Sequence, residues 1–198
     1  MNIAIIGATG KFGRLFTAKL LTNPNYQLTV ISKSAERIYE NSHRVTAISL
    51  DATNQKDLQK ALKGQDLVYC AVSGVDQPVI ARNLVESNVN RLIYMTVVGI
   101  YNELAEGNGD EYNVDNEKEQ IPNRNAAEII EKSNLDYTIL RCGYLINGDE
   151  DEYEITKKGE SPKGYISTIE SVEKIALEII ENNEKYSRES ISITKDMS

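Results

Sequence analysis

The segment that decides the fold is NIAIIGATGKFGRLF, residues 2–16. Its first part, Asn2–Ile6, is apolar almost throughout, which predicts a strand of a parallel sheet that is covered on both faces. The next part, Gly7–Gly13, reads G-x-x-G-x-x-G and leads into a helix. Glycines in such a turn let the backbone bend sharply and approach a diphosphate, while the helix N-terminus offers free N–H groups to the anion. The segment therefore predicts a dinucleotide site, with a tight turn that holds no ligand as the alternative.

Beyond this segment, short apolar runs alternate with helical patterns. The expected strands are Asn2–Ile6, Gln27–Ile31, Val45–Leu50, Asp66–Val72, Arg91–Val97, Asp136–Arg141 and Ser190–Ile193. The expected helices are Lys11–Thr22, Gln55–Leu62, Gln77–Ser87, Val114–Lys132 and Glu170–Asn182. This order predicts a doubly wound α/β sheet of the Rossmann type, with flanking helices and a ligand crevice at the carboxyl ends of the strands. We find no repeat or linker that would divide residues 1–198, so one domain is expected.

Two polar stretches depart from this pattern. Glu103–Gln120 is acidic with two glycines, and Asn147–Gly164 begins with acidic residues that are followed by three lysines. Each follows an expected strand, which places substrate or lid loops at about residues 101–122 and 147–168. Ordinary solvated loops are the alternative.

Composition excludes several function classes. With 22 Lys and Arg against 30 Asp and Glu, the formal charge is −8, which disfavours nucleic acids and anionic membranes as partners. The absence of a membrane-spanning apolar run or a signal-peptide pattern favours a cytoplasmic protein. Cys70 and Cys142 lie in apolar segments and His43 is the one histidine, so we expect two reduced core thiols, no metal site and no histidine-based triad.

The end of the second expected strand indicates which coenzyme binds. An NAD site places a carboxylate about 20 residues beyond the glycines, but this chain has Ser32, Lys33 and, a little further on, Arg37. Hydroxyls and cations there can hold a 2′-phosphate, so NADP(H) is favoured over NAD(H). In the alternative interpretation these are ordinary surface cations, and Glu36 neutralises Arg37.

The next strand ends supply further coenzyme contacts. Asp51 can accept a hydrogen bond from the adenine amino group, unless it caps the helix that begins near Gln55. Ser73 and Gly74 let the backbone approach the coenzyme, unless Gly74 only makes a turn. The complete set of candidate coenzyme residues is Gly7, Thr9, Gly10, Lys11, Phe12, Gly13, Ser32, Lys33, Arg37, Asp51, Ala52, Val72, Ser73, Gly74 and Thr96.

Together, five segments resemble the atypical short-chain dehydrogenase/reductase proteins of the NAD(P)H-binding, NmrA-like group. They are Gly7–Gly13, Leu50–Thr53, Asn90–Thr96, Leu135–Arg141 and Tyr165–Ser167. The resemblance covers nearly the whole chain. It implies a Rossmann fold that commonly binds NADP(H), with Lys33 where the group often has a basic residue. It also implies a function among reductases of flavins, quinones or small carbonyl compounds, or among redox sensors that do not catalyse a reaction.

The chain departs from the wider superfamily at the catalytic residues, because the Y-x-x-x-K pair that would protonate a carbonyl oxygen is missing about 25 residues after Thr96, where Ile121, Pro122 and Asn123 stand. The same spacing occurs at Tyr153 and Lys157, but inside the polar stretch Asn147–Gly164 and not at the expected place. Thr96 stands where a hydroxyl residue is expected, Tyr101 or Tyr112 could supply a phenol, and Arg124 could replace the lysine. Alternatively, Thr96 only ends a strand, the tyrosines are surface rings and Arg124 pairs with Glu128.

The missing pair favours an NADPH-dependent reductase of a flavin, quinone or similar small acceptor, because reduced flavins and quinones take protons from water. The alternative is a non-enzymatic NADP(H) sensor whose acidic loop Glu103–Gln120 docks a partner. An epimerase or dehydratase with bound NAD fits Lys33 poorly and lacks room for a sugar-nucleotide domain. We expect a monomer or homodimer that binds a small-molecule acceptor.

Overall fold

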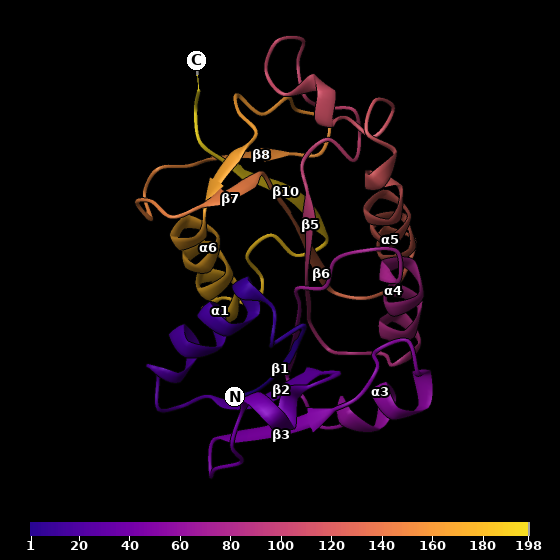
Figure 1. Cartoon of the computed structure of the whole chain (residues 1–198), viewed down its shortest axis with the longest axis vertical. Helices are drawn as coiled ribbons and strands as arrows, with labels where there is room; N and C mark the ends of the chain where they lie inside the picture. The colour runs from indigo at the N-terminus through magenta and orange to yellow at the C-terminus, as the bar shows by residue number, and fades with distance from the viewer. Residues whose placement is uncertain (198) are drawn as a thin grey trace.

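Eight strands form one sheet in the computed structural model, which describes residues 1–197 (Figure 1). In spatial order they are β3 (Val45–Ser49), β2 (Gln27–Ser32), β1 (Asn2–Ile6), β4 (Leu67–Cys70), β5 (Leu92–Val97), β6 (Tyr137–Cys142), β10 (Glu189–Thr194) and β8 (Glu154–Lys157). Neighbours are parallel except β8, which runs antiparallel to β10. The strand order reverses between β1 and β4, and this switch point opens a crevice at the carboxyl ends of the strands.

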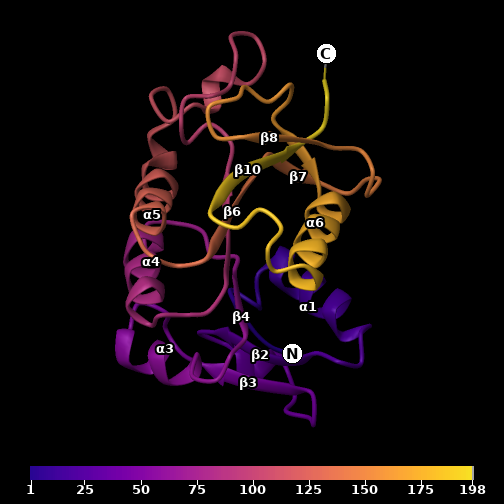
Figure 2. The ribbon, with the colours of Figure 1, turned by 180° about the vertical axis from the view of Figure 1, so that it is seen from behind.

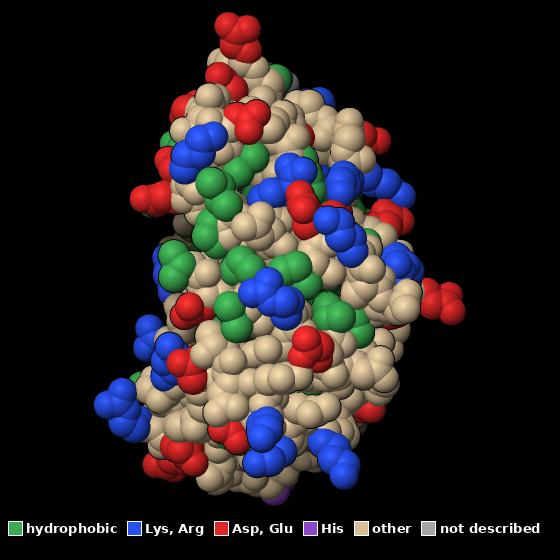
Figure 3. Space-filling model, turned by 90° about the vertical axis from the view of Figure 1, so that its right-hand side faces the viewer, with side chains coloured by type: hydrophobic (Ala, Val, Ile, Leu, Met, Phe, Trp, Pro, Cys, Tyr) green, Lys and Arg blue, Asp and Glu red, His purple; other side chains and the backbone are tan. Residues whose placement is uncertain are grey.

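Helices cover both faces of the sheet, as Figures 1 and 2 show. One face carries α1 (Lys11–Leu21) and α6 (Ile169–Glu181), and the other carries α3 (Gln55–Ala61), α4 (Gln77–Glu86) and α5 (Ile121–Glu131). Each buries an apolar stripe against the strands, and the outer surface of the α3, α4 and α5 layer mixes hydrophobic and charged side chains (Figure 3). The expected single-domain Rossmann-type fold is thus confirmed.

Four elements were not expected from the sequence, because they are short. They are the one-turn helix α2 (Ala35–Ile38), the strand β8, and the strands β7 (Tyr144–Ile146) and β9 (Ile166–Thr168), which pair with each other in a small parallel sheet. The expected helix Val114–Lys132 is wrong at its start. Residues 118–120 form the 3₁₀ turn η2, and α5 begins only at Ile121, because Pro122, which has no N–H to donate, fits the first turn of a helix. A further unexpected 3₁₀ turn, η1 at residues 110–112, lies before the expected helix.

Both cysteines are unpaired and buried, as expected. Burial raises the pKa of the Cys70 and Cys142 thiols to about 12. Within residues 1–197, no group of three or more His, Cys, Asp and Glu side chains is arranged to hold a metal ion. In the same range, no helix combines the length and the apolar character needed to cross a bilayer.

Candidate active site

The glycine-rich turn joins β1 to α1 at the carboxyl ends of the strands, in the middle of the sheet. Gly7 has a φ of +84°, and a Cβ there would lie 2.6 Å from the carbonyl oxygen of Ala71 at the end of β4. A Cβ on Gly13 would overlap the carbonyl oxygen of Gly7. Both glycines therefore bring the helix and β4 close to the turn, which side chains would prevent.

The start of α1 is open to an anion. Gly10 is the N-cap residue and has no side chain to cap the helix, and the first turn holds no acidic residue. The first-turn N–H groups, which belong to Lys11, Phe12 and Gly13, therefore have no capping side chain, as a diphosphate site requires. Tyr39, which was not identified from the sequence, stabilises this turn, since its hydroxyl donates to the carbonyl oxygen of Ala8 at 2.7 Å.

At the end of β2, the structure brings two candidate coenzyme residues together. The Lys33 ammonium lies 2.9 Å from the Asp51 carboxylate, and the lysine side chain is 68% exposed. Asp51 also accepts hydrogen bonds from the Thr53 N–H and hydroxyl. The hydrogen bond from Lys33, together with these two bonds, lowers the pKa of Asp51 to about 2. Arg37 is exposed, and no ion pair joins it to Glu36 within residues 1–197.

The loop after β3 is held by residues other than those expected. Asn54, rather than Asp51, caps α3, since its side chain accepts from the Asp57 N–H. Asn83 of α4 donates to the carbonyl oxygens of Ala52 and Thr53 at 2.9 and 3.0 Å, which fixes the loop. The alternative role of Asp51 as a helix cap is therefore wrong.

Beside Lys11, at the start of α1, lies a cavity of about 510 Å³, which we call the tyrosine cavity. It is lined by Lys11, Val97, Val98, Tyr112, Glu117, Glu119, Gln120, Cys142, Gly143, Tyr144, Leu145 and Tyr165. The Tyr112 and Tyr165 rings lie 5.3 Å apart and are tilted by 38°. Since Lys11 belongs to the glycine-rich turn, the cavity adjoins the candidate coenzyme site, and its apolar and aromatic walls suit a flat ring.

Of the four candidate catalytic residues, only Tyr112 lines this cavity. Thr96 is buried and its hydroxyl accepts from the Val97 N–H, so Val97 and not Thr96 meets the cavity. Arg124 pairs with Glu128 at 2.7 Å and donates to the carbonyl oxygen of Ile100. Arg124 thus makes the pairing with Glu128 that was the alternative, and its role in place of the lysine stays a prediction.

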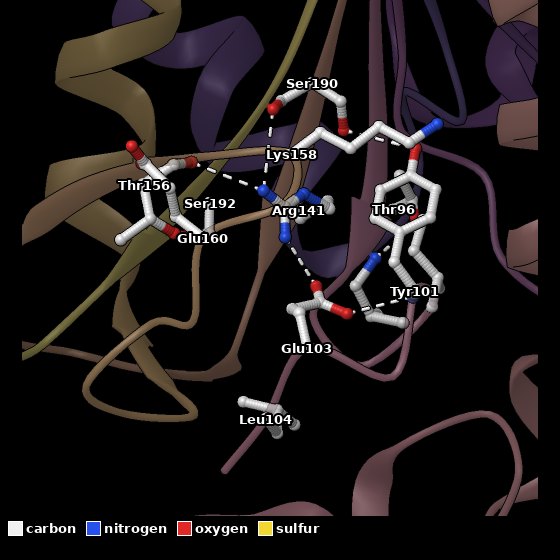
Figure 4. A network of polar contacts seen from close by, with 12 residues as sticks. Thr96, Tyr101, Glu103, Leu104, Arg141, Thr156, Lys158, Glu160, Ser190 and Ser192 are labelled. Atoms are coloured by element: carbon white, nitrogen blue, oxygen red, sulfur yellow. Dashed lines mark hydrogen bonds and ion pairs between the residues drawn. The ribbon is translucent and has the colours of Figure 1, made fainter.

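Tyr101 belongs to a polar network outside the tyrosine cavity, shown in Figure 4. Its hydroxyl donates to Glu131 at 2.7 Å, and the Lys158 ammonium lies 4.4 Å from its ring centre. Burial raises the pKa of this phenol well above its ordinary value. The Tyr101 phenol therefore lies outside the cavity with its hydroxyl bonded to Glu131, and its role as a proton donor stays a prediction.

The same network anchors the loop at residues 103–120. Arg141 of β6 is fully buried and pairs with Glu103, whose second oxygen accepts from the Tyr101 N–H (Figure 4). Further along, the Asn113 side chain makes two hydrogen bonds with the Leu104 backbone. The loop that carries Tyr112 is therefore fixed at its base and part-way along.

Several residues of the cavity were not identified from the sequence. Tyr144 and Tyr165 come together because β7 pairs with β9, and the Tyr144 N–H donates to the carbonyl oxygen of Tyr165 at 2.7 Å. Gly143 allows this approach, since a Cβ there would overlap the Tyr165 backbone. The segment Tyr165–Ser167 contributes to the family resemblance, but nothing local in the sequence places it beside Tyr112.

Comparison with known proteins now identifies the family. Residues 7–183 match the model of the NAD(P)H-binding family. The chain belongs to this family. The NAD(P)H-binding chain is therefore an oxidoreductase of the atypical short-chain dehydrogenase/reductase kind, which confirms the resemblance seen in its motifs. Among curated proteins, none matches it.

Solved structures agree with this assignment. A Rossmann-fold NAD(P)-binding family protein from Shigella flexneri is 30% identical over 100% of this chain and 94% of its own, with a TM-score of 0.82. A short-chain dehydrogenase/reductase of wide type from Veillonella parvula, solved in complex with NADP, is 27% identical over 99% of this chain and 95% of its own, with a TM-score of 0.86. An anaerobillin reductase from Escherichia coli, 17% identical over 100% of this chain and 98% of its own with a TM-score of 0.80, shares the fold.

Proposed function

We propose that this NAD(P)H-binding protein is a reductase that transfers hydride from NADPH to a small acceptor of the flavin, quinone or carbonyl type. The observation that carries the proposal is the tyrosine cavity, which adjoins the glycine-rich turn through Lys11. NADPH, when bound, supplies the hydride. The apolar and aromatic walls would hold the acceptor and exclude water, so that positioning does most of the catalysis.

The residues at the turn fit the coenzyme. The first-turn N–H groups of α1 would bind the diphosphate, and Ser32, Lys33 and Arg37 would bind the 2′-phosphate. A flavin or quinone acceptor gains a hydride from the coenzyme and a proton from water, so its reduction needs no tyrosine and lysine pair. For a carbonyl acceptor, Tyr112 is the phenol of the four catalytic candidates that lines the cavity.

The coenzyme preference is tested by Lys33→Ala. Because a hydrogen bond to a charged group is lost, the dissociation constant of NADPH should rise roughly tenfold to a hundredfold, while that of NADH stays nearly constant. Lys63→Ala is the matched control. Lys63 is an exposed lysine in the turn between α3 and β4, at the amino ends of the strands, whereas Lys33 lies at their carboxyl ends. Equal weakening of both coenzymes by Lys33→Ala would contradict a 2′-phosphate role for this residue.

Turnover is tested by following NADPH oxidation with a panel of flavins, quinones and small carbonyl compounds. A reductase should oxidise NADPH at a rate that depends on the acceptor added. If the protein binds NADPH tightly but oxidises it with no compound of the panel, the reductase proposal is contradicted and the non-enzymatic redox sensor is favoured. Calorimetry would then compare NADP⁺ with NADPH, because a sensor must distinguish the two oxidation states.

A further inference from the structure

The charges of the tyrosine cavity are unbalanced. Its charged lining residues are Lys11, Glu117 and Glu119. Lys11 is the first residue of α1, where the coenzyme diphosphate of the proposed function would neutralise it. Neither glutamate forms an ion pair within residues 1–197. With coenzyme bound, the cavity therefore keeps two negative charges.

Hydrogen bonds within the loop hold Glu117 at the cavity, and Glu119 is an exposed side chain two residues further on. The Glu117 N–H donates to the carbonyl oxygen of Asn113 at 2.7 Å, and the Glu117 carboxylate accepts from the Glu119 N–H at 3.2 Å. Lys118 lies between them in sequence, but its ammonium donates to backbone carbonyl oxygens, at 2.7 Å in the case of Asp115. The base of the loop is fixed by the buried pair of Arg141 and Glu103 (Figure 4).

We infer that the tyrosine cavity selects uncharged planar acceptors over anionic ones, an inference that rests on the proposed function. The aromatic walls, Tyr112 and Tyr165, contact a flat ring whatever its charge. Glu117 and Glu119 then repel an acceptor that carries a phosphate or carboxylate. The walls thus supply the affinity for the ring, and the two glutamates supply the discrimination by charge.

Riboflavin and flavin mononucleotide test the inference, because they share one ring system and side chain and differ by a phosphate. Their binding to the NADP⁺-loaded protein is measured by flavin fluorescence at two salt concentrations. Riboflavin should bind about tenfold more tightly at low ionic strength and about threefold near 0.15 M salt, since salt screens the repulsion. In Glu117→Gln/Glu119→Gln the preference should disappear.

The control variant is Glu106→Gln/Glu111→Gln, which removes two charges from the same loop at exposed positions outside the cavity lining. It should keep the wild-type preference. Equal binding of both flavins, binding of neither, or a preference that survives Glu117→Gln/Glu119→Gln would overturn the inference. Failure of the proposed function would appear separately, as the absence of NADPH oxidation with every acceptor while this binding preference is intact.

Discussion

At the scale of single residues, the contact between Lys33 and Asp51 bears on coenzyme choice. The lysine that would bind a 2′-phosphate is already paired with a carboxylate 2.9 Å away. A phosphate must therefore compete with Asp51 for the same ammonium. In Asp51→Asn this competition ends while the acceptor oxygen for Thr53 is retained, so NADPH should bind about threefold more tightly relative to NADH. Titration of both coenzymes at pH 8 measures this ratio, and an unchanged or lower ratio would contradict the competition.

The same pair has a defined dependence on pH. The pKa of Asp51 falls from 3.8 to about 2 in the folded protein, so the carboxylate stabilises the fold above pH 4 and loses this effect as the pH falls towards 2. The pKa of Lys33 is raised by the same partner, so the lysine stays charged throughout this range. The difference in melting temperature between the wild type and Asp51→Asn should thus be constant from pH 5 to pH 8, shrink as the pH falls from 4 to 2, and vanish only below pH 2.

At the scale of elements, the buried ion pair decides whether the loop at residues 103–120 stays in place. Arg141 has a side chain that is 0% exposed and Glu103 one that is 5% exposed. Glu103→Gln leaves the guanidinium buried without a counter-charge, which should cost about 3–5 kcal/mol of unfolding free energy. Urea denaturation measures this loss. Because the loop carries Tyr112, binding of riboflavin should weaken as well.

An exposed ion pair serves as the control for this change. Lys132 pairs with Glu128 on the surface of α5, and its side chain is 77% exposed. Lys132→Ala should cost about 1 kcal/mol or less, since solvent screens such pairs. Similar losses for Lys132→Ala and Glu103→Gln would show that the buried pair does not anchor the loop.

These elements also show how far a sequence can be interpreted. The glycine-rich turn was predictable because its strand, glycines and helix are contiguous, and its geometry depends on backbone sterics. The start of α5 was not, because residues 117–120 have helix-forming side chains, but the segment before them is held by contacts from outside it, such as the hydrogen bond from the Asp115 N–H to the Asn102 side chain, and Lys118–Gln120 forms a 3₁₀ turn. Likewise, the network around Tyr101 depends on Glu131 and Ser190, which are distant in sequence.

At the scale of the whole molecule, the candidate site combines segments from most of the chain. The residues predicted to bind the coenzyme come directly after strands. Because the carboxyl ends of parallel strands lie on the same side of a sheet, this part of the site could be located from the sequence. The acceptor half depends on Tyr112 and Tyr165, which are 53 positions apart and meet through loop packing and the short pair of β7 and β9. No local pattern encodes such a meeting.

The two cysteines allow global unfolding to be measured on both faces of the sheet. Cys70 packs with the α3, α4 and α5 layer and Cys142 with the α1 and α6 layer, and burial keeps both thiols protonated with a pKa of about 12. Iodoacetamide at pH 8 should therefore label both only on global unfolding, at one common rate. NADPH at a hundred times its dissociation constant should slow both reactions about a hundredfold, because it binds the native state alone. Since Cys142 also lines the tyrosine cavity, faster labelling of Cys142 than of Cys70 would instead reveal local opening of the cavity wall.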